Sequence, residues 1–131
     1  MLDWDTESMF TDAVLDHFRT PRNAGELANA TSSVDVRNPV CGDVLHLAAR
    51  VENGHITEAR FLCQGCTTAI ACASLLTVEL TKRKLSEALH ITAESLSEGL
   101  GGLPPTTQHA AQLAADALTA LLTRLKSAQE R

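Results

Sequence analysis

The spacing of apolar residues changes twice along the chain, and this change constrains the fold more than any other feature. In residues 33–63 apolar and polar side chains alternate, as they do in strands with one buried face. Before and after this stretch the apolar residues recur every three or four positions, which is the spacing of amphipathic helices. Strands followed by helices predict an α+β fold, in which helices pack on one face of a three-stranded antiparallel sheet. We expect residues 1–131 to form a single domain, because the chain has the length of one domain.

The helices have recognisable boundaries. Pro21, with Asn23 and Gly25 behind it, ends the first helix. The second helix follows Gly65 and is closed by Lys82-Arg83-Lys84, whose charges suit the negative end of a helix dipole. The predicted helical segments are 6–18, 66–80, 86–89, 92–100 and 107–127.

Glu52-Asn53-Gly54 is a hairpin signal between the second and third predicted strands. A two-residue loop would set charged residues opposite apolar ones, whereas a three-residue loop over 52–54 pairs Leu45 with Phe61. Because cross-strand neighbours share one face of the sheet, the three-residue loop is predicted. In this register Asp43 lies opposite Cys63.

Charge and composition exclude several function classes. With 11 Lys+Arg against 16 Asp+Glu, the chain lacks the basic surface that nucleic-acid binding requires. No stretch approaches the ~20 apolar residues of a membrane span, and the acidic N-terminus does not have the pattern of a signal peptide. We therefore expect a cytoplasmic protein that binds neither nucleic acid nor membranes. In that reducing compartment, cysteines serve metal binding or catalysis more often than disulfides.

Three of the four cysteines are predicted to meet at one end of the hairpin. Cys41 lies two residues before Asp43 and faces the same way, and Cys66 follows the turn after Cys63. The Cys-x-x-Cys spacing of Cys63 and Cys66 suits tetrahedral zinc or an iron–sulfur cluster. The fourth cysteine, Cys72, falls on the far side of the next helix and is predicted to be a small buried hydrophobic residue.

The spacing does not determine whether Cys63 and His109 are metal ligands. Cys63 lies on the apolar face of its strand, so packing in the core explains it as well as metal binding does. His109 follows the Pro104-Pro105 pair at the start of the last helix, and sequence spacing alone does not identify it as a ligand.

Three motifs occur together and in order, with Pro21-Arg22-Asn23 before them. They are Asn38-Pro39-Val40-Cys41-Gly42-Asp43, then Gly65-Cys66-Thr67-Thr68-Ala69-Ile70-Ala71-Cys72-Ala73-Ser74, then Leu103-Pro104-Pro105 followed by His109. In this combination the chain resembles the IscU/NifU/SufU-type scaffolds of iron–sulfur cluster assembly, and it is more similar to the IscU-like branch. The resemblance extends over nearly the whole chain.

The resemblance implies a function. Members of this family receive sulfur as persulfide from a cysteine desulfurase, assemble a [2Fe-2S] cluster and pass it to apo-proteins. By this resemblance the chain is a binding and transfer protein and not an enzyme, and Zn²⁺ is a further occupant of the same site. The implied ligands are Cys41, Asp43, Cys66 and His109, and the oxygen ligand makes the cluster labile beside softer thiolates.

The chain departs from the family pattern at two places. Where the family has a third cysteine directly after the histidine, this chain has Ala110, which cannot bind a metal. Our hypothesis is that Cys63 substitutes for that thiol, so that the site contains Cys41, Cys63 and Cys66 with Asp43 or His109. After the second proline of the third motif the chain continues with Thr106-Thr107 instead of Val-Lys, which weakens the expectation that an Hsp70-type chaperone docks there.

Three other functions remain open at this point. The first is a zinc-bound sulfur acceptor in which Cys41 takes the persulfide. The second is a thiol–disulfide oxidoreductase that uses Cys63 and Cys66, although no βαβ unit surrounds the pair. The third is a family member that keeps only the fold and a structural zinc. The chain is expected to be a monomer or a weak homo-oligomer.

Overall fold

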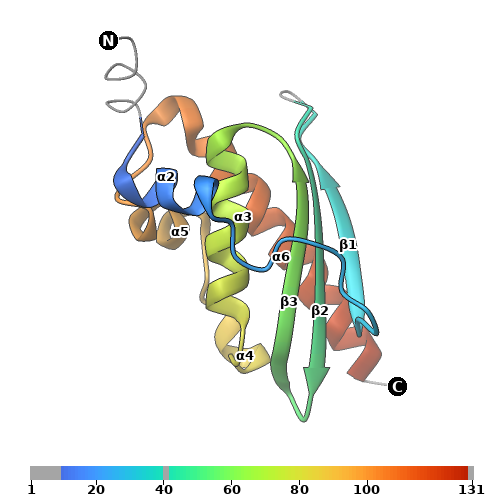
Figure 1. Cartoon of the computed structure of the whole chain (residues 1–131). Helices are drawn as coiled ribbons and strands as arrows, with labels where there is room; N and C mark the ends of the chain where they lie inside the picture. Colours follow the sequence, from blue (N-terminus) through green and yellow to red (C-terminus); the bar gives the residue numbers. More distant parts are fainter. Residues whose placement is uncertain (1–9, 40–41, 130–131) are drawn as a thin grey trace, which may run out of the picture.

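Helices cover one face of a three-stranded antiparallel sheet in the computed structural model, which describes residues 10–39 and 42–129 (Figure 1). The strands lie in the order β1-β2-β3, and the arrangement confirms the predicted α+β fold. No helix in this part of the chain is long and apolar enough to cross a membrane. In chain order the elements are α2 (Asp12–Arg19), β1 (Ser32–Arg37), β2 (Val44–Glu52), β3 (His55–Gln64), α3 (Thr67–Leu80), α4 (Leu85–Ala88), α5 (Ala93–Gly99), η1 (Pro105–Thr107) and α6 (Gln108–Gln129).

Helix α3 is central to the core. It contacts β3 and α6, and it also contacts α2 and α5, so that it runs between the sheet and these short helices (Figure 1). Because α3 is covered on more than one side, it lacks the polar face of a surface helix. Even Ser74 and Thr77 are buried, and the Ser74 hydroxyl accepts the backbone N–H of Arg22 at 2.9 Å.

The β2–β3 hairpin differs from the prediction. Glu52 pairs with His55, which leaves a two-residue loop of Asn53 and Gly54 with φ angles of 54° and 79°. Two successive positive φ angles are typical of the turn that matches the twist of a hairpin. The predicted three-residue loop is therefore wrong. The strand accommodates an extra residue farther along, as a bulge at Thr57.

The bulge changes the pairing of the two strands. Leu45 lies opposite Cys63, whereas the prediction paired it with Phe61. The predicted pairing of Asp43 with Cys63 is therefore wrong. The observed register is displaced by two residues from the predicted one. Because side chains alternate with a period of two, this displacement keeps each residue on its predicted face and changes only its partner.

Helix α2 begins later than predicted. The Thr11 hydroxyl oxygen accepts the backbone N–H of Val14 at 3.1 Å, and the same hydroxyl donates to the carbonyl of Leu100. Threonine is a common N-cap because it satisfies an N–H group that has no partner within the helix. The helix prediction for 6–18 is thus confirmed from Asp12 onward, and residues 6–9 lie outside the described part of the chain.

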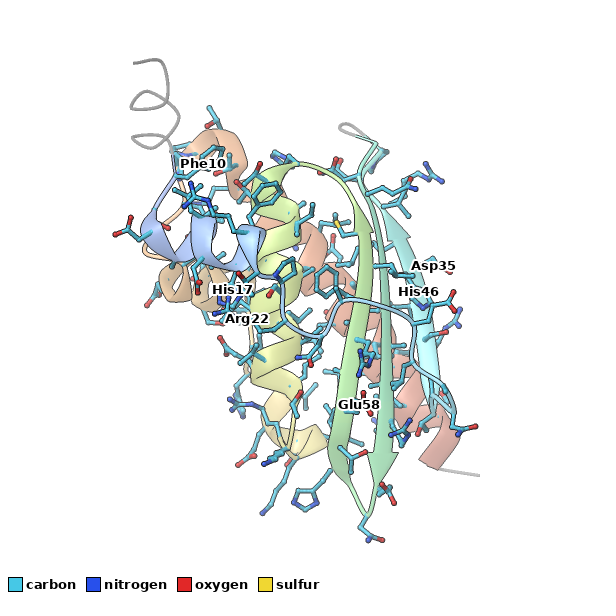
Figure 2. The ribbon with its side chains drawn as sticks, viewed as in Figure 1. Phe10, His17, Arg22, Asp35, His46 and Glu58 are labelled. Carbon is cyan, nitrogen blue, oxygen red and sulfur yellow. The ribbon has the colours of Figure 1, made fainter. Side chains whose placement is uncertain are left out.

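A polar contact joins the end of α2 to α3. Nδ1 of His17 lies 2.7 Å from the Ser74 hydroxyl oxygen, and Figure 2 shows His17 close to Arg22. Burial and the Arg22 guanidinium lower the pKa of His17, and Asp16 acts in the opposite direction. Folding therefore favours the neutral imidazole. The resulting stability is present above the unfolded pKa of about 6.5 and is lost as the pH falls through the lower folded pKa.

We expect His17→Gln to reduce the loss of stability at acid pH. Urea denaturation at about pH 7.5 and about pH 5.5 should show a larger decrease in unfolding free energy for the wild type than for this variant. His55→Gln, which replaces an exposed histidine, is the control and should behave as the wild type does. Equal decreases in the wild type and His17→Gln would contradict the prediction.

Candidate metal centre

Asp43, Cys66 and His109 come from three elements that begin at the same end of the sheet. Asp43 directly precedes β2, Cys66 is the N-cap of α3, and His109 is the second residue of α6. Because β3 runs antiparallel to β2, it ends beside the start of β2, and the turn after Gln64 starts α3 there (the upper end in Figure 1). Residues far apart in sequence thus meet at one sheet end.

These three residues, which we call the ligand group, have the geometry of a metal site. One potential ligand atom from each lies within 4.8 Å of the others, and Nε2 of His109 is 4.0 Å from Oδ2 of Asp43. Asp43 is buried, His109 is half-buried and Cys66 is exposed. Carboxylate oxygen, imidazole nitrogen and thiolate sulfur are the ligand types of zinc and iron. The group therefore offers a metal ion ligand atoms both from the inside of the protein and from its surface.

One oxygen of Asp43 lacks a hydrogen bond. Its Oδ2 is buried and has no hydrogen-bond partner among the described residues. The backbone N–H of Asn38 donates to the Asp43 carbonyl at 2.8 Å, and a Cβ on Gly65 would lie 3.0 Å from the Asp43 Cγ. The glycine thus lets the chain pass directly against the carboxylate. A buried polar group without a partner costs about 1–3 kcal/mol, and a cation bound here removes that cost. This observation fits a metal site.

Cys66 is placed by the start of α3. Its sulfur accepts the backbone N–H of Ala69 at 3.4 Å, as an N-cap side chain does. The N-terminal end of a helix carries partial positive charge. This charge is directed at the sulfur, which is a favourable setting for an anionic metal ligand.

Cys63 lies beside the ligand group and not within it. It is the next-to-last residue of β3, opposite Leu45, and its half-buried side chain packs against the core. Burial raises the pKa of the Cys63 thiol to about 11, and the negative charges of Asp43 and Cys66 act in the same direction. The pairing with Leu45, two residues after Asp43, places the thiol near the carboxylate, although it is absent from the group of atoms within 4.8 Å.

The other predicted site residues have different outcomes. Cys72 is fully buried in the core, where burial raises its pKa to about 12, and this confirms its predicted role as a small hydrophobic residue. Cys41 lies outside the described residues. Ala110 is buried beside His109 and offers no ligand atom.

The position of His109 follows from the packing of α6. This helix contacts β1, β2 and α3, and its first turn lies at the sheet end that carries Asp43, as the 4.0 Å between His109 Nε2 and Asp43 Oδ2 shows. A hollow of about 220 Å³ lies next to His109. It could not be predicted from the local sequence, because the residues that line it come from separate elements. It is lined by Arg37, Asn38, Pro39, His109, Gln112, Leu113 and Asp116.

Sequence comparisons identify related proteins. The sequence model of the family described as "NifU-like N terminal domain" matches residues 9–131. The iron-sulfur cluster assembly scaffold protein IscU 1 of Archaeoglobus fulgidus is 42% identical over 110 residues, which are 84% of this chain and 72% of that protein. The iron-sulfur cluster assembly scaffold protein IscU of Escherichia coli K12 is 38% identical over 125 residues, which are 92% and 97% of the two chains.

Structure comparison agrees with the sequence comparisons. The N-terminal part of a NifU-like protein from Brucella abortus has a TM-score of 0.77 to this structure, and the match covers 93% of this chain and 97% of that one. At 12% identity this likeness concerns the fold alone. The family match and the two IscU relatives extend over most of the chain, and the chain therefore belongs to the IscU/NifU family.

Proposed function

We propose that the chain is an iron–sulfur cluster assembly scaffold that takes sulfur from a cysteine desulfurase, builds a [2Fe-2S] cluster and passes it to apo-proteins. The observation that carries this proposal is the convergence of Asp43, Cys66 and His109, with a buried carboxylate oxygen that has no hydrogen-bond partner among the described residues. The names of the IscU relatives support the same function. In this proposal the cluster is cargo, and the protein binds and transfers it without acting as an enzyme.

The mixture of donors suits a cargo that is held and then released. Thiolates are the usual ligands of iron–sulfur clusters, whereas a carboxylate is a harder ligand that binds less well beside them. Asp43 approaches the cargo from inside the protein, and Cys66 approaches it from the exposed side. Cys41, which the family resemblance implies as a further ligand, lies outside the described residues. We place the reaction in the cytoplasm, where thiols stay reduced.

Sulfur delivery needs a thiolate that the donor can reach. We assign this role to Cys66, because its side chain is exposed at a helix start. The Cys66 sulfur attacks the terminal sulfur of the desulfurase persulfide, a new S–S bond forms on Cys66, and the desulfurase thiolate leaves. Reduction of the transferred sulfur to sulfide takes two electrons, which an external thiol reductant supplies as it forms a disulfide.

The same ligand group supports a second candidate, a zinc-bound sulfur acceptor. Cysteine, histidine and aspartate all occur as ligands of tetrahedral zinc. In this alternative Zn²⁺ occupies the site, and Cys41 takes the persulfide after ligand exchange. A thiol–disulfide oxidoreductase is disfavoured, because the described strands form an antiparallel sheet and no βαβ unit surrounds Cys63 and Cys66.

Anaerobic reconstitution tests the proposed function. The purified apo-protein is incubated with iron and sulfide, and visible absorption is recorded with the iron, sulfide and zinc content. Cluster absorption bands with iron and sulfide in equal amounts are the expected result. Tight zinc that iron and sulfide do not displace would favour the zinc-bound sulfur acceptor and contradict the scaffold.

A further inference from the structure

The ligand group contains one thiol, although the chain has four cysteines. Cys72 is fully buried within the core and does not reach the site. Ala110, directly after His109, has an apolar side chain that is buried in the core. Among the described residues, Cys63 is therefore the one further thiol that is placed to take part in cargo binding.

The end of β3 brings Cys63 next to the ligand group. Gly65 passes so close to Asp43 that a Cβ there would lie 3.0 Å from the carboxylate carbon. Cys63, the next-to-last residue of β3, pairs with Leu45, which is two residues after Asp43, so Cys63 is a diagonal neighbour of Asp43 across the hairpin. It also lies three residues before Cys66, which is the spacing of paired cysteine ligands in zinc and iron–sulfur sites.

The separation of Cys63 from the ligand group fits a cargo with two irons. A single ion gathers all its ligands around one point, whereas the ligands of a [2Fe-2S] cluster are divided between two iron atoms. Each iron takes two protein ligands, so the three residues of the ligand group cannot all bind one iron, and a thiol just outside the group is positioned to bind the second iron with one of them. Cys63 is half-buried and not enclosed in the core as Cys72 is, so its thiol is accessible at the sheet end that carries Asp43.

We propose that Cys63 is a ligand of the cargo cluster and binds the second iron. This inference rests on the proposed scaffold function. The competing explanation is that Cys63 only packs against the core, since its side chain contacts core residues. The two explanations differ in whether the cluster depends on the sulfur atom at this position.

The first test compares cluster content in the wild type, Cys63→Ser, Cys63→Ala and Cys72→Ala after reconstitution with iron and sulfide. Cys72→Ala is the matched control, because it removes a thiol from the core near the same helix. We expect the two Cys63 variants to hold on the order of tenfold less cluster than the wild type and Cys72→Ala. Residual cluster in Cys63→Ser should have shifted absorption bands, because oxygen replaces sulfur on iron. Far-UV circular dichroism checks that each variant is folded.

A second measurement uses the wild type alone and decides the case if a variant does not fold. Iodoacetamide alkylation of each cysteine is followed by mass spectrometry with and without the cluster. Loading should slow alkylation of Cys63 and Cys66 alike. Full cluster content with unchanged bands in both Cys63 variants, or equal alkylation of Cys63 in both states, would overturn the inference alone. A wild type that assembles no cluster would overturn the scaffold function and this inference with it.

Discussion

Cys66→Ser is expected to abolish cluster binding while the fold remains intact. Serine is a preferred N-cap, so its hydroxyl can accept the Ala69 N–H that the thiol accepts now, and α3 keeps its first turn. The hydroxyl cannot replace a soft thiolate as a ligand to iron. The iron and sulfide bound per chain after reconstitution should therefore fall by at least on the order of tenfold, with no decrease in the melting temperature of the apo-protein.

Cys72→Ala is the control for this experiment and should give the opposite result. Its thiol is fully buried in the core, so its removal leaves the site unchanged. The small cavity that remains should lower the unfolding free energy by about 1 kcal/mol, which urea denaturation measures. A Cys66→Ser protein that retained the full cluster content would show that the ligand group is not the cluster site.

Asp43→Ala is expected to make the cluster harder to release. The carboxylate is the hardest donor of the ligand group, and its loss leaves the cluster to softer ligands that bind iron more strongly. Transfer to an apo-ferredoxin or to a chelator should therefore slow by on the order of tenfold. The decay of the cluster absorption after mixing gives this rate.

The same substitution should stabilise the apo-protein. Oδ2 of Asp43 is buried and has no hydrogen-bond partner among the described residues, so its removal should raise the unfolding free energy by about 1–3 kcal/mol. Asp35→Ala, which removes an exposed carboxylate from β1, is the charge-matched control. It should neither slow cluster transfer nor raise the unfolding free energy of the apo-protein. Faster cluster loss from Asp43→Ala, or a less stable apo-protein, would mean that the carboxylate mainly holds the cargo or the fold together.

The two predictions for Asp43→Ala, slower cluster release and a more stable apo-protein, describe a site that is less stable without its cargo. Natural proteins retain buried polar groups without partners mainly where function needs them. Asp43 fits this pattern, because the structure around it leaves one oxygen available and places an imidazole nitrogen 4.0 Å away. The proposed cargo completes the interactions of the carboxylate.

Sequence periodicity predicts most of the fold because burial is a local property of each element. Alternation in residues 33–63 identifies the faces of the strands, and the segments after Gly65 match α3 to α6 to within a few residues. The hairpin register was not predictable in this way. A bulge at Thr57 adds one residue without changing which side chains are apolar, so a pattern with a period of two cannot distinguish registers that differ by two residues.

The sequence by itself determined the chemistry that the chain can offer: the faces of the strands, the cysteines, and the aspartate and histidine of the family motifs. The tertiary structure decided which of these residues meet. Asp43, Cys66 and His109 come together because β3 returns antiparallel to the start of β2 and α6 packs across the sheet from that end. The same packing encloses Cys72 and leaves Cys63 beside the ligand group. The physical reason is that local spacing reports burial within one element, whereas a metal site depends on distances between elements, which only the packed core sets.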